Sequence, residues 1–311
     1  MLKIHINDPL DEDALRKLKN DLPNAEITSE YFDKEVLKEK IKDYDVLIVR
    51  SATKVTKDML ENVDKLKIIG RAGMGLDNID VETAKAKGIK VLNTPGQNSL
   101  SVAELVLGMV LDIYRHITRG TVGLREGKWE KKQLKGLELS KKTFGIIGFG
   151  YVGKNLANLL KGFETETLIY DLVKLTEEEI KEYKVKQVSL EELLKNSDVI
   201  SLHVPKNDKT YHMISDEQFE EMKEKVVIIN AARGGVLDEK ALLKYLKNGK
   251  VLGAGLDVFE EEPPTSEFYK ELLSMPNVVA TPHIGASTDE AQARVGINIV
   301  DRVVEEVKKL N

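Results

Sequence analysis

Apolar residues along this chain gather in short runs, and longer stretches with helical spacing separate these runs. Runs such as 45–49 and 226–230 are almost wholly apolar, as expected of strands that are covered on both faces. The expected strands are 2–6, 45–49, 66–70, 89–92, 143–148, 166–170, 198–202, 226–230, 251–255 and 277–280. Charged helical patterns separate the first of them, at 11–20, 33–43, 56–62 and 80–87. This rhythm predicts an α/β protein with parallel sheets and right-handed crossovers.

The rhythm breaks near 94–99, and the segment that follows differs from the rest of the chain. An expected helix at 102–116 is apolar nearly all round, which indicates a domain core or a subunit interface. The polar stretch 119–139 contains the single tryptophan, Trp129, and is interpreted as an arm that contacts a second subunit. The last expected helix, 287–310, has no strand left to follow, so we expect it to cross back onto the N-terminal domain. The predicted domains are 1–97 with 286–311, and 98–285 inserted between them.

A glycine-rich turn joins one expected strand to the next helix, with glycines spaced Gly-x-Gly-x-x-Gly. Gly148 permits the tight turn, Gly150 lets a pyrophosphate approach the backbone, and Gly153 lets the helix pack closely on the strand. The phosphates would bind the free N–H groups at the start of the helix, near Tyr151. The pattern therefore predicts a dinucleotide-binding turn.

Asp171 ends the next expected strand, eighteen residues beyond Gly153. A carboxylate at this place accepts hydrogen bonds from the adenosine ribose hydroxyls and repels a 2′-phosphate. Since no arginine follows it directly and Lys174 is the only nearby cation, the sequence predicts NAD rather than NADP. The predicted fold is two doubly wound parallel-sheet domains, with a Rossmann NAD-binding domain inserted into a flavodoxin-like substrate domain.

Three late strands are each followed by one unusual polar residue, at the edge where an open parallel sheet binds its ligand. Arg233 leaves an apolar run on a Gly-Gly turn and is suited to grip a carboxylate with its bidentate fork. Glu262 is fixed by the two prolines that follow it. His283 comes straight after a strand and a proline, and it is the expected catalytic residue.

Other ionisable residues near these strands receive different interpretations. His203 ends a strand and is expected to line the cofactor crevice rather than to transfer a proton. Glu260 and Glu261 belong to a run of acids, which is typical of a solvated surface. The remaining histidines are interpreted as structural, namely His5, His116 and His212.

Composition excludes several classes of protein. A net charge of −5 with mixed Lys, Arg, Asp and Glu leaves no basic face for nucleic acid. With no cysteine there is no disulfide, thiolate metal site or cysteine nucleophile, and no other cluster has metal-ligand spacing. Without a membrane-spanning apolar run or a signal peptide, we expect no membrane partner and a cytoplasmic location.

Together the motifs resemble the D-isomer-specific 2-hydroxyacid dehydrogenases over nearly the whole chain, and within that family its phosphoglycerate-oxidising branch most. The matching stretches are RAGMGLDNID at 71–80, NTPGQNSLSVAE at 93–104, the glycine turn at 148–153, NAARGG at 230–235, DVFEEEP at 257–263 and TPHIGAST at 281–288.

The resemblance implies a role for each matched residue. Arg233 would orient the substrate carboxylate and polarise C2–O, and Glu262 would pair with the imidazole, favour its charged form and fix its tautomer. His283 would exchange the C2 hydroxyl proton while hydride passes to or from the nicotinamide. The expected cofactor-binding residues are Gly148, Gly150, Tyr151, Val152, Gly153, Asp171, His203, Val204, Pro205, Ala231, Ala232, Asp257 and Gly285. The expected substrate-binding residues are Arg50, Ser51, Gly73, Met74, Gly75, Asn98 and Lys131.

The leading expectation is NAD-dependent oxidation of D-3-phosphoglycerate to 3-phosphohydroxypyruvate, the first step of serine synthesis, by a homodimer. The substrate phosphate needs cations, for which Arg50, Lys54 and Lys131 from a second subunit are the candidates. Two alternatives stay open: a glyoxylate or hydroxypyruvate reductase of the same family, and a nicotinamide-sensing binding protein like the corepressors that share the fold. A cleft between two domains implies closure over the substrate, which excludes water. Because the chain ends directly after its last expected helix, serine inhibition through a C-terminal regulatory domain is not expected.

Overall fold

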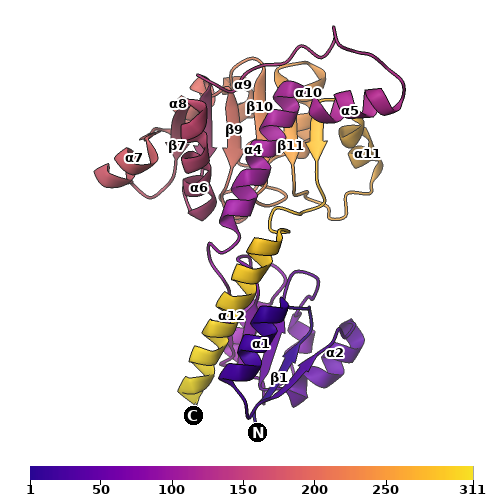
Figure 1. Ribbon diagram of the computed structural model, residues 1–311, viewed down its shortest axis with the longest axis vertical. Coiled ribbons are helices and arrows are strands. Elements are labelled where there is room, and N and C mark those ends of the chain that lie inside the picture. The colour runs from indigo at the N-terminus through magenta and orange to yellow at the C-terminus, as the bar shows by residue number, and fades with distance from the viewer. Residues whose placement is uncertain (311) are drawn as a thin grey trace. The chain divides into compact units, whose positions relative to one another are not determined.

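The computed structural model describes residues 1–310 and divides them into two compact units. Unit 1 comprises Met1–Asn98 and the C-terminal segment that begins at Ala286, and unit 2 comprises Ser99–Gly285. Each unit has one wholly parallel sheet with helices on both faces (Figure 1). The prediction of an α/β protein with two doubly wound sheets is therefore confirmed.

The sheet of unit 1 has the strand order β2-β1-β3-β4-β5, which is the flavodoxin-like arrangement. Its central strands are fully buried because helices cover them on both sides. The strands are β1 (Lys3–Ile6), β2 (Glu26–Ser29), β3 (Val46–Val49), β4 (Ile68–Arg71) and β5 (Lys90–Leu92). Strand β2 was not predicted from sequence, since its residues are mostly polar and lie at the edge of the sheet.

Helix α12 (Asp289–Leu310) belongs to unit 1 and packs beside α1 (Glu12–Asp21) over the sheet (Figure 1). A Cβ atom on Gly296 would lie 2.9 Å from that of Ala14, so the two helices approach closely. The other helical segments of unit 1 are α2 (Lys34–Lys40), η1 (Ile41–Asp43), η2 (Lys57–Met59) and α3 (Val81–Ala86). The expected helix at 56–62 is wrong beyond the one turn η2, because Asn62 and Asp64 favour turns.

The sheet of unit 2 has the order β12-β11-β10-β9-β6-β7-β8, so its strand order reverses between β6 and β9. This is the Rossmann arrangement with one extra strand, and ligands bind such sheets at the carboxyl ends near the reversal. The strands are β6 (Thr143–Ile147), β7 (Glu166–Tyr170), β8 (Val185–Gln187), β9 (Val199–Leu202), β10 (Val226–Asn230), β11 (Val251–Leu256) and β12 (Val278–Ala280).

Two layers of helices enclose this sheet. Helices α4 (Ser99–Arg115) and α6 (Tyr151–Leu160) pack on one face, and α8 to α11 pack on the other. The remaining bounds are α5 (Ile117–Arg125), η3 (Lys161–Phe163), α7 (Glu177–Tyr183), α8 (Leu190–Asn196), α9 (Asp216–Glu221), α10 (Glu239–Lys247) and α11 (Glu267–Ser274).

The segment after α4 differs from its prediction in two ways. His116 does not lie in a buried helix: it has a left-handed backbone (φ 54°) and separates α4 from α5. The polar arm also begins with the helix α5, and beyond it Trp129 is 80% exposed. None of the helices within residues 1–310 has the length and apolar character that a membrane crossing requires.

Candidate active site

The three glycines of the turn between β6 and α6 meet different surroundings. Gly148 has φ 92°, and a Cβ there would lie 2.5 Å from the carbonyl oxygen of His203. A Cβ on Gly153 would lie 2.5 Å from the carbonyl oxygen of Gly148, so α6 packs directly on the turn. Around Gly150, however, nothing lies within 4 Å of an added Cβ. The fold therefore requires two of these glycines, and the space in front of Gly150 fits a ligand.

Helix α6 starts in this open space. Gly150 is its N-cap and provides no side-chain hydrogen bond, so the first backbone N–H groups from Tyr151 onward have no cap. Uncapped N–H groups at the positive end of a helix bind phosphate. The turn thus fits the pyrophosphate of a dinucleotide.

Asp171 follows β7 and lies against the same turn. Its Oδ2 accepts the backbone N–H of Phe149 at 2.6 Å, and its Oδ1 accepts that of Val173 at 2.8 Å. Each carboxylate oxygen has a second lone pair, so both can still accept a hydroxyl. This placement suits the ribose contact expected from the sequence.

His203 follows β9, on the other side of the turn from Asp171. Its backbone N–H donates to Ile147 at 2.7 Å, and its Nε2 lies 2.8 Å from the hydroxyl of Ser201. Burial lowers the pKa of His203 to about 3. The imidazole is therefore neutral at physiological pH and unsuited to donate a proton, and the next residue, Val204, packs beside Gly148.

Arg233, Glu262 and His283 follow three neighbouring strands, β10, β11 and β12. Because these strands are parallel, the three residues lie beyond the same edge of the sheet. The first two loops are in direct contact, since a Cβ on Gly234 would lie 1.7 Å from the carbonyl oxygen of Phe259. Only glycine fits at that position.

His283 and Glu262 form a pair. Nδ1 of His283 lies 3.0 Å from Oε2 of Glu262, while Oε1 accepts the backbone N–H of Phe259 at 3.1 Å. The carboxylate only accepts, so Nδ1 carries a hydrogen and Nε2 is the nitrogen left for proton exchange. Both side chains are accessible to a ligand, with 51% and 39% of their surfaces exposed.

Asp257, at the end of β11, holds the loop that carries His283. It is 2% exposed, and its Oδ1 accepts the hydroxyl of Thr281 at 2.6 Å and the N–H of Ile284 at 2.7 Å. Its Oδ2 accepts the N–H of Gly285 at 2.8 Å. Asp257 was expected to bind the cofactor; its contacts here are to the loop, and the cofactor role stays a prediction.

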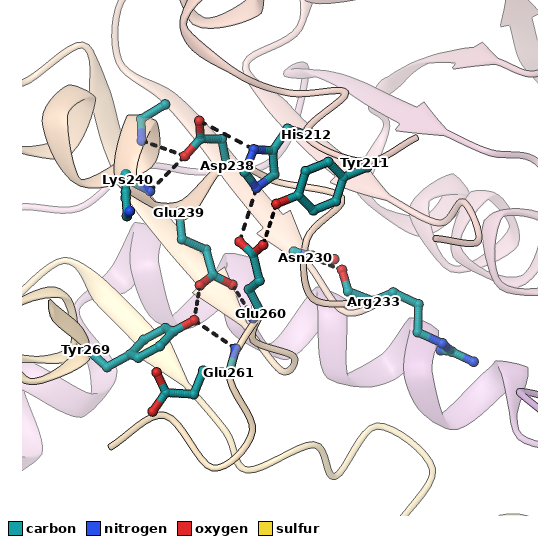
Figure 2. A network of polar contacts seen from close by, with 11 residues as sticks. Tyr211, His212, Asn230, Arg233, Asp238, Glu239, Lys240, Glu260, Glu261 and Tyr269 are labelled. Atoms are coloured by element: carbon teal, nitrogen blue, oxygen red, sulfur yellow. Dashed lines mark hydrogen bonds and ion pairs between the residues drawn. The ribbon is translucent and has the colours of Figure 1, made fainter. Parts of the chain in front are cut away.

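Glu260 is exposed, as expected for a member of the acidic run, but it also has two specific partners. Its two oxygens accept the hydroxyl of Tyr211 at 2.7 Å and contact Nε2 of His212 at 3.1 Å (Figure 2). Both partners precede α9, far from Glu260 along the chain, so no local pattern indicates the contact. Figure 2 also shows the side chain of Arg233 directed away from this network; its Nη1 donates to the carbonyl of Ala232 at 2.7 Å.

In unit 1, two arginines lie at the carboxyl edge of the sheet. Arg50 follows β3 and Arg71 ends β4, and Val49 pairs with Arg71 across these neighbouring strands. The backbone of Arg50 is held by Asp8, whose Oδ2 accepts its N–H at 2.6 Å. The guanidinium of Arg71 lies over Gly73, because a Cβ there would be 1.3 Å from Nη1. Arg71 was missed as a candidate, although it opens one of the matched motifs.

The other expected residues lie on the surface or partly beneath it. Exposed are Ser51, Met74, Lys131, Tyr151 and Pro205, half-buried are Gly75, Asn98, Val152, Val204, Ala231 and Ala232, and buried is Gly285. The structure brings the expected cofactor residues of unit 2 to one edge of its sheet. Arg50 and Gly73 to Gly75 lie at the corresponding edge in unit 1.

Comparisons with known proteins point to one family. Residues 107–285 match the family described as D-isomer specific 2-hydroxyacid dehydrogenase, NAD binding domain. The chain is 54% identical over 305 residues to a hydroxypyruvate reductase of Thermotoga maritima, which covers 98% of each chain. It is 47% identical to a D-3-phosphoglycerate dehydrogenase of Methanocaldococcus jannaschii, covering 97% of this chain but only 57% of that protein. Among solved structures, D-lactate dehydrogenase from Aquifex aeolicus complexed with NAD and lactic acid has a TM-score of 0.85 and 32% identity, covering 99% of this chain and 96% of the other.

Proposed function

Since the chain belongs to the D-isomer specific 2-hydroxyacid dehydrogenase family, we propose that it oxidises D-3-phosphoglycerate at C2, or catalyses the reverse reduction. The family gives the coarse function: the protein is an oxidoreductase that acts on 2-hydroxy acids, with NAD as its cofactor. The observation that carries the catalytic assignment is the His283–Glu262 pair at the end of two neighbouring strands, with Arg233 on the third.

In this proposal unit 2 provides the chemistry. The turn at Gly150, the start of α6 and Asp171 hold the cofactor, which supplies the hydride acceptor. Arg233 binds the substrate carboxylate with two parallel N–H groups. His283 takes the C2 hydroxyl proton on Nε2, and Glu262 stabilises the imidazolium that results.

Unit 1 would act as the substrate domain and bind the phosphate. Arg50 and Arg71 follow neighbouring strands, so two cations lie at one edge of its sheet. Lys54 lies four residues beyond Arg50 and is exposed. A phosphate needs this concentration of positive charge in a protein of net charge −5. We further propose a cytoplasmic homodimer in which Lys131 reaches the site from a second subunit's arm.

The second candidate is reduction of hydroxypyruvate, which needs no phosphate site. It is favoured by the hydroxypyruvate reductase, which is 54% identical to this chain, against 47% for the phosphoglycerate dehydrogenase.

Steady-state kinetics with phosphohydroxypyruvate, hydroxypyruvate and glyoxylate separates the two. We expect kcat/KM for phosphohydroxypyruvate to exceed the others by at least about 10²-fold, since each hydrogen bond to a charged group is worth about 1.5–3 kcal/mol. Replacing Arg71 with Ala should lower kcat/KM for phosphohydroxypyruvate at least about tenfold and leave kcat/KM for hydroxypyruvate nearly unchanged. Similar efficiencies on all three substrates, or equal losses in R71A, contradict the phosphate assignment.

Replacing His283 with Ala tests catalysis itself. Loss of the acid and base should cut turnover by at least about 10²-fold while NADH binding stays nearly the same. A nicotinamide sensor, the non-enzymatic alternative, would bind NADH but show no appreciable turnover in the unaltered protein. An unchanged rate in H283A means that another residue is the base.

A further inference from the structure

Glu239, the first residue of α10, contacts the backbone of Glu260, which belongs to the loop that carries Glu262 (Figure 2). The residue is 3% exposed, and its Oε1 accepts the backbone N–H of Glu260 at 3.0 Å. Its Oε2 accepts the hydroxyl of Tyr269, whose oxygen in turn accepts the backbone N–H of Glu261 at 3.0 Å. One buried carboxylate and its tyrosine therefore fix two consecutive amides directly before Glu262.

The position of this backbone decides what Glu262 can reach. Its carboxylate bridges two groups, the N–H of Phe259 at 3.1 Å and Nδ1 of His283 at 3.0 Å. A side chain with both oxygens engaged in this way has little freedom to compensate for a displaced backbone. A shift of about 1 Å in such a group is enough to cost about 10²-fold in rate.

We propose that Glu239 is a positioning residue for the dehydrogenase reaction, because it holds the loop from which Glu262 orients His283. The inference rests on the proposed role of His283 as acid and base. A carboxylate suits the task, since it only accepts hydrogen bonds and the groups it meets are two donors, the N–H of Glu260 and the hydroxyl of Tyr269.

Stability of the fold does not account for a carboxylate at this position. Burial raises the pKa of Glu239, and its hydrogen bonds from Tyr269 and Glu260 offset that only in part. The ionised form therefore costs folding free energy that an apolar side chain of similar size would not. The second anchor of the loop, between Glu260 and His212, is exposed and contributes less order.

A double-mutant cycle between Glu239 and Glu262 tests the proposal. Glu239→Ala should lower kcat between about tenfold and 10²-fold with KM for the 2-oxo acid nearly constant, since the pair acts in the transition state. Glu262→Gln should lower kcat by at least about 10²-fold, because its amide no longer fixes the imidazole tautomer. In the E262Q background, Glu239→Ala should lower kcat by less than a further factor of about three. Glu239 acts on His283 through Glu262, and that connection is already lost in E262Q.

The outcomes are distinct. If the fold-losses in kcat of the two single variants multiply in the double variant, Glu239 acts only through the general fold. If kcat is unchanged in E239A, the loop does not need Glu239. Either result overturns the proposal. If Glu262→Gln and His283→Ala leave kcat unchanged, the proposed catalytic function fails instead, whatever Glu239 does.

A second pair of variants covers the case in which E239A does not fold. Tyr269→Phe keeps the ring but removes the acceptor of the Glu261 N–H, so kcat should fall at least about threefold. The matched control is Tyr245→Phe, since Tyr245 is also a buried tyrosine that donates to a glutamate, Glu220, but its hydrogen-bond partners lie on α9 and not in the loop. Equal kcat in the two variants would contradict the proposal. Glu239→Gln keeps one oxygen for Glu260 and should restore kcat to within about threefold of the unaltered protein.

Discussion

Gly150 offers a sharp test of the cofactor site, because the structure separates its role in folding from its role in binding. Its backbone has φ −77° and ψ −155°, which any residue can adopt, and nothing lies within 4 Å of an added Cβ. Replacing Gly150 with Ala should therefore leave the fold intact and change its stability by less than about 1 kcal/mol, because the reduced freedom of the unfolded chain opposes the weaker N-cap that alanine provides.

Binding of the cofactor should respond much more strongly than stability. The added methyl group occupies the space into which we place the pyrophosphate, and an extra methyl in a filled contact costs about 1–3 kcal/mol. Since each 1.4 kcal/mol is a factor of ten, the Kd for NADH should rise about 5- to 150-fold. Replacing Gly148 would not make this distinction, because its φ of 92° and its contact with His203 make glycine necessary for folding.

The assay is a fluorescence titration with NADH alongside thermal unfolding without cofactor. Gly162→Ala is the matched control, because an added Cβ there also has nothing within 4 Å, and it should leave the Kd unchanged. If G150A binds NADH as tightly as the unaltered protein, the pyrophosphate does not approach this backbone. If G150A unfolds at a clearly lower temperature, the added Cβ atom disturbs the fold itself, and the space in front of Gly150 is not open in the way that the structure shows.

Further predictions concern cofactor choice, packing, assembly and pH. Replacing Asp171 with Ala should weaken the binding of NAD more than the binding of NADP in titrations, and equal losses of affinity would contradict its contact with the ribose. Gly234→Ala places a Cβ 1.7 Å from a carbonyl oxygen, so urea unfolding should show that the free energy of unfolding falls by at least about 1–3 kcal/mol. An unaltered free energy of unfolding would contradict the close contact. If the arm docks on a second subunit, the emission of Trp129, 80% exposed in one chain, should shift to shorter wavelength as dilute protein is concentrated, and a constant spectrum argues against a dimer. Because burial raises the pKa of Glu239, the folded protein binds this proton more tightly than the unfolded chain. The free energy of unfolding of the unaltered protein should thus fall relative to that of E239Q as pH rises above 4.5. If urea unfolding gives the same difference between the two proteins at every pH, this prediction is wrong.

The fold could be predicted from sequence wherever strands are buried on both faces. The central strands are continuous apolar runs, and these were placed to within one or two residues. The edge strands β2 and β8 were missed, since Glu-Ile-Thr-Ser and Val-Lys-Gln have one exposed side and no apolar run. The two helices that flank β8, α7 and α8, were not predicted individually either.

The catalytic candidates could also be predicted, while the residues that hold them could not. Arg233, Glu262 and His283 are visible because each follows a strand within a compact motif. Glu239 and Tyr269 contact the same loop from two different helices. Glu239 is 21 residues from its partner Glu260, and Tyr269 is 8 residues from its partner Glu261. Tyr211 is 49 residues from Glu260. Patterns of apolar periodicity report which face of an element is buried, but not which distant loop a buried polar group meets.

The two loops that we propose to carry catalysis are held in place in the same way, although their functional side chains are exposed. His283 and Glu262 must be exposed to meet a substrate, and exposed loop residues are ordinarily the least ordered part of a protein. Each loop is therefore fixed from beneath by a buried acid that accepts its backbone N–H groups: Asp257 under His283, and Glu239 under Glu262. The desolvation of these acids is offset by donors that stay in place whether or not substrate is bound. Rigid placement of the pair is then built into the free protein, so a change at either buried acid should appear in kcat although neither belongs to the exposed pair.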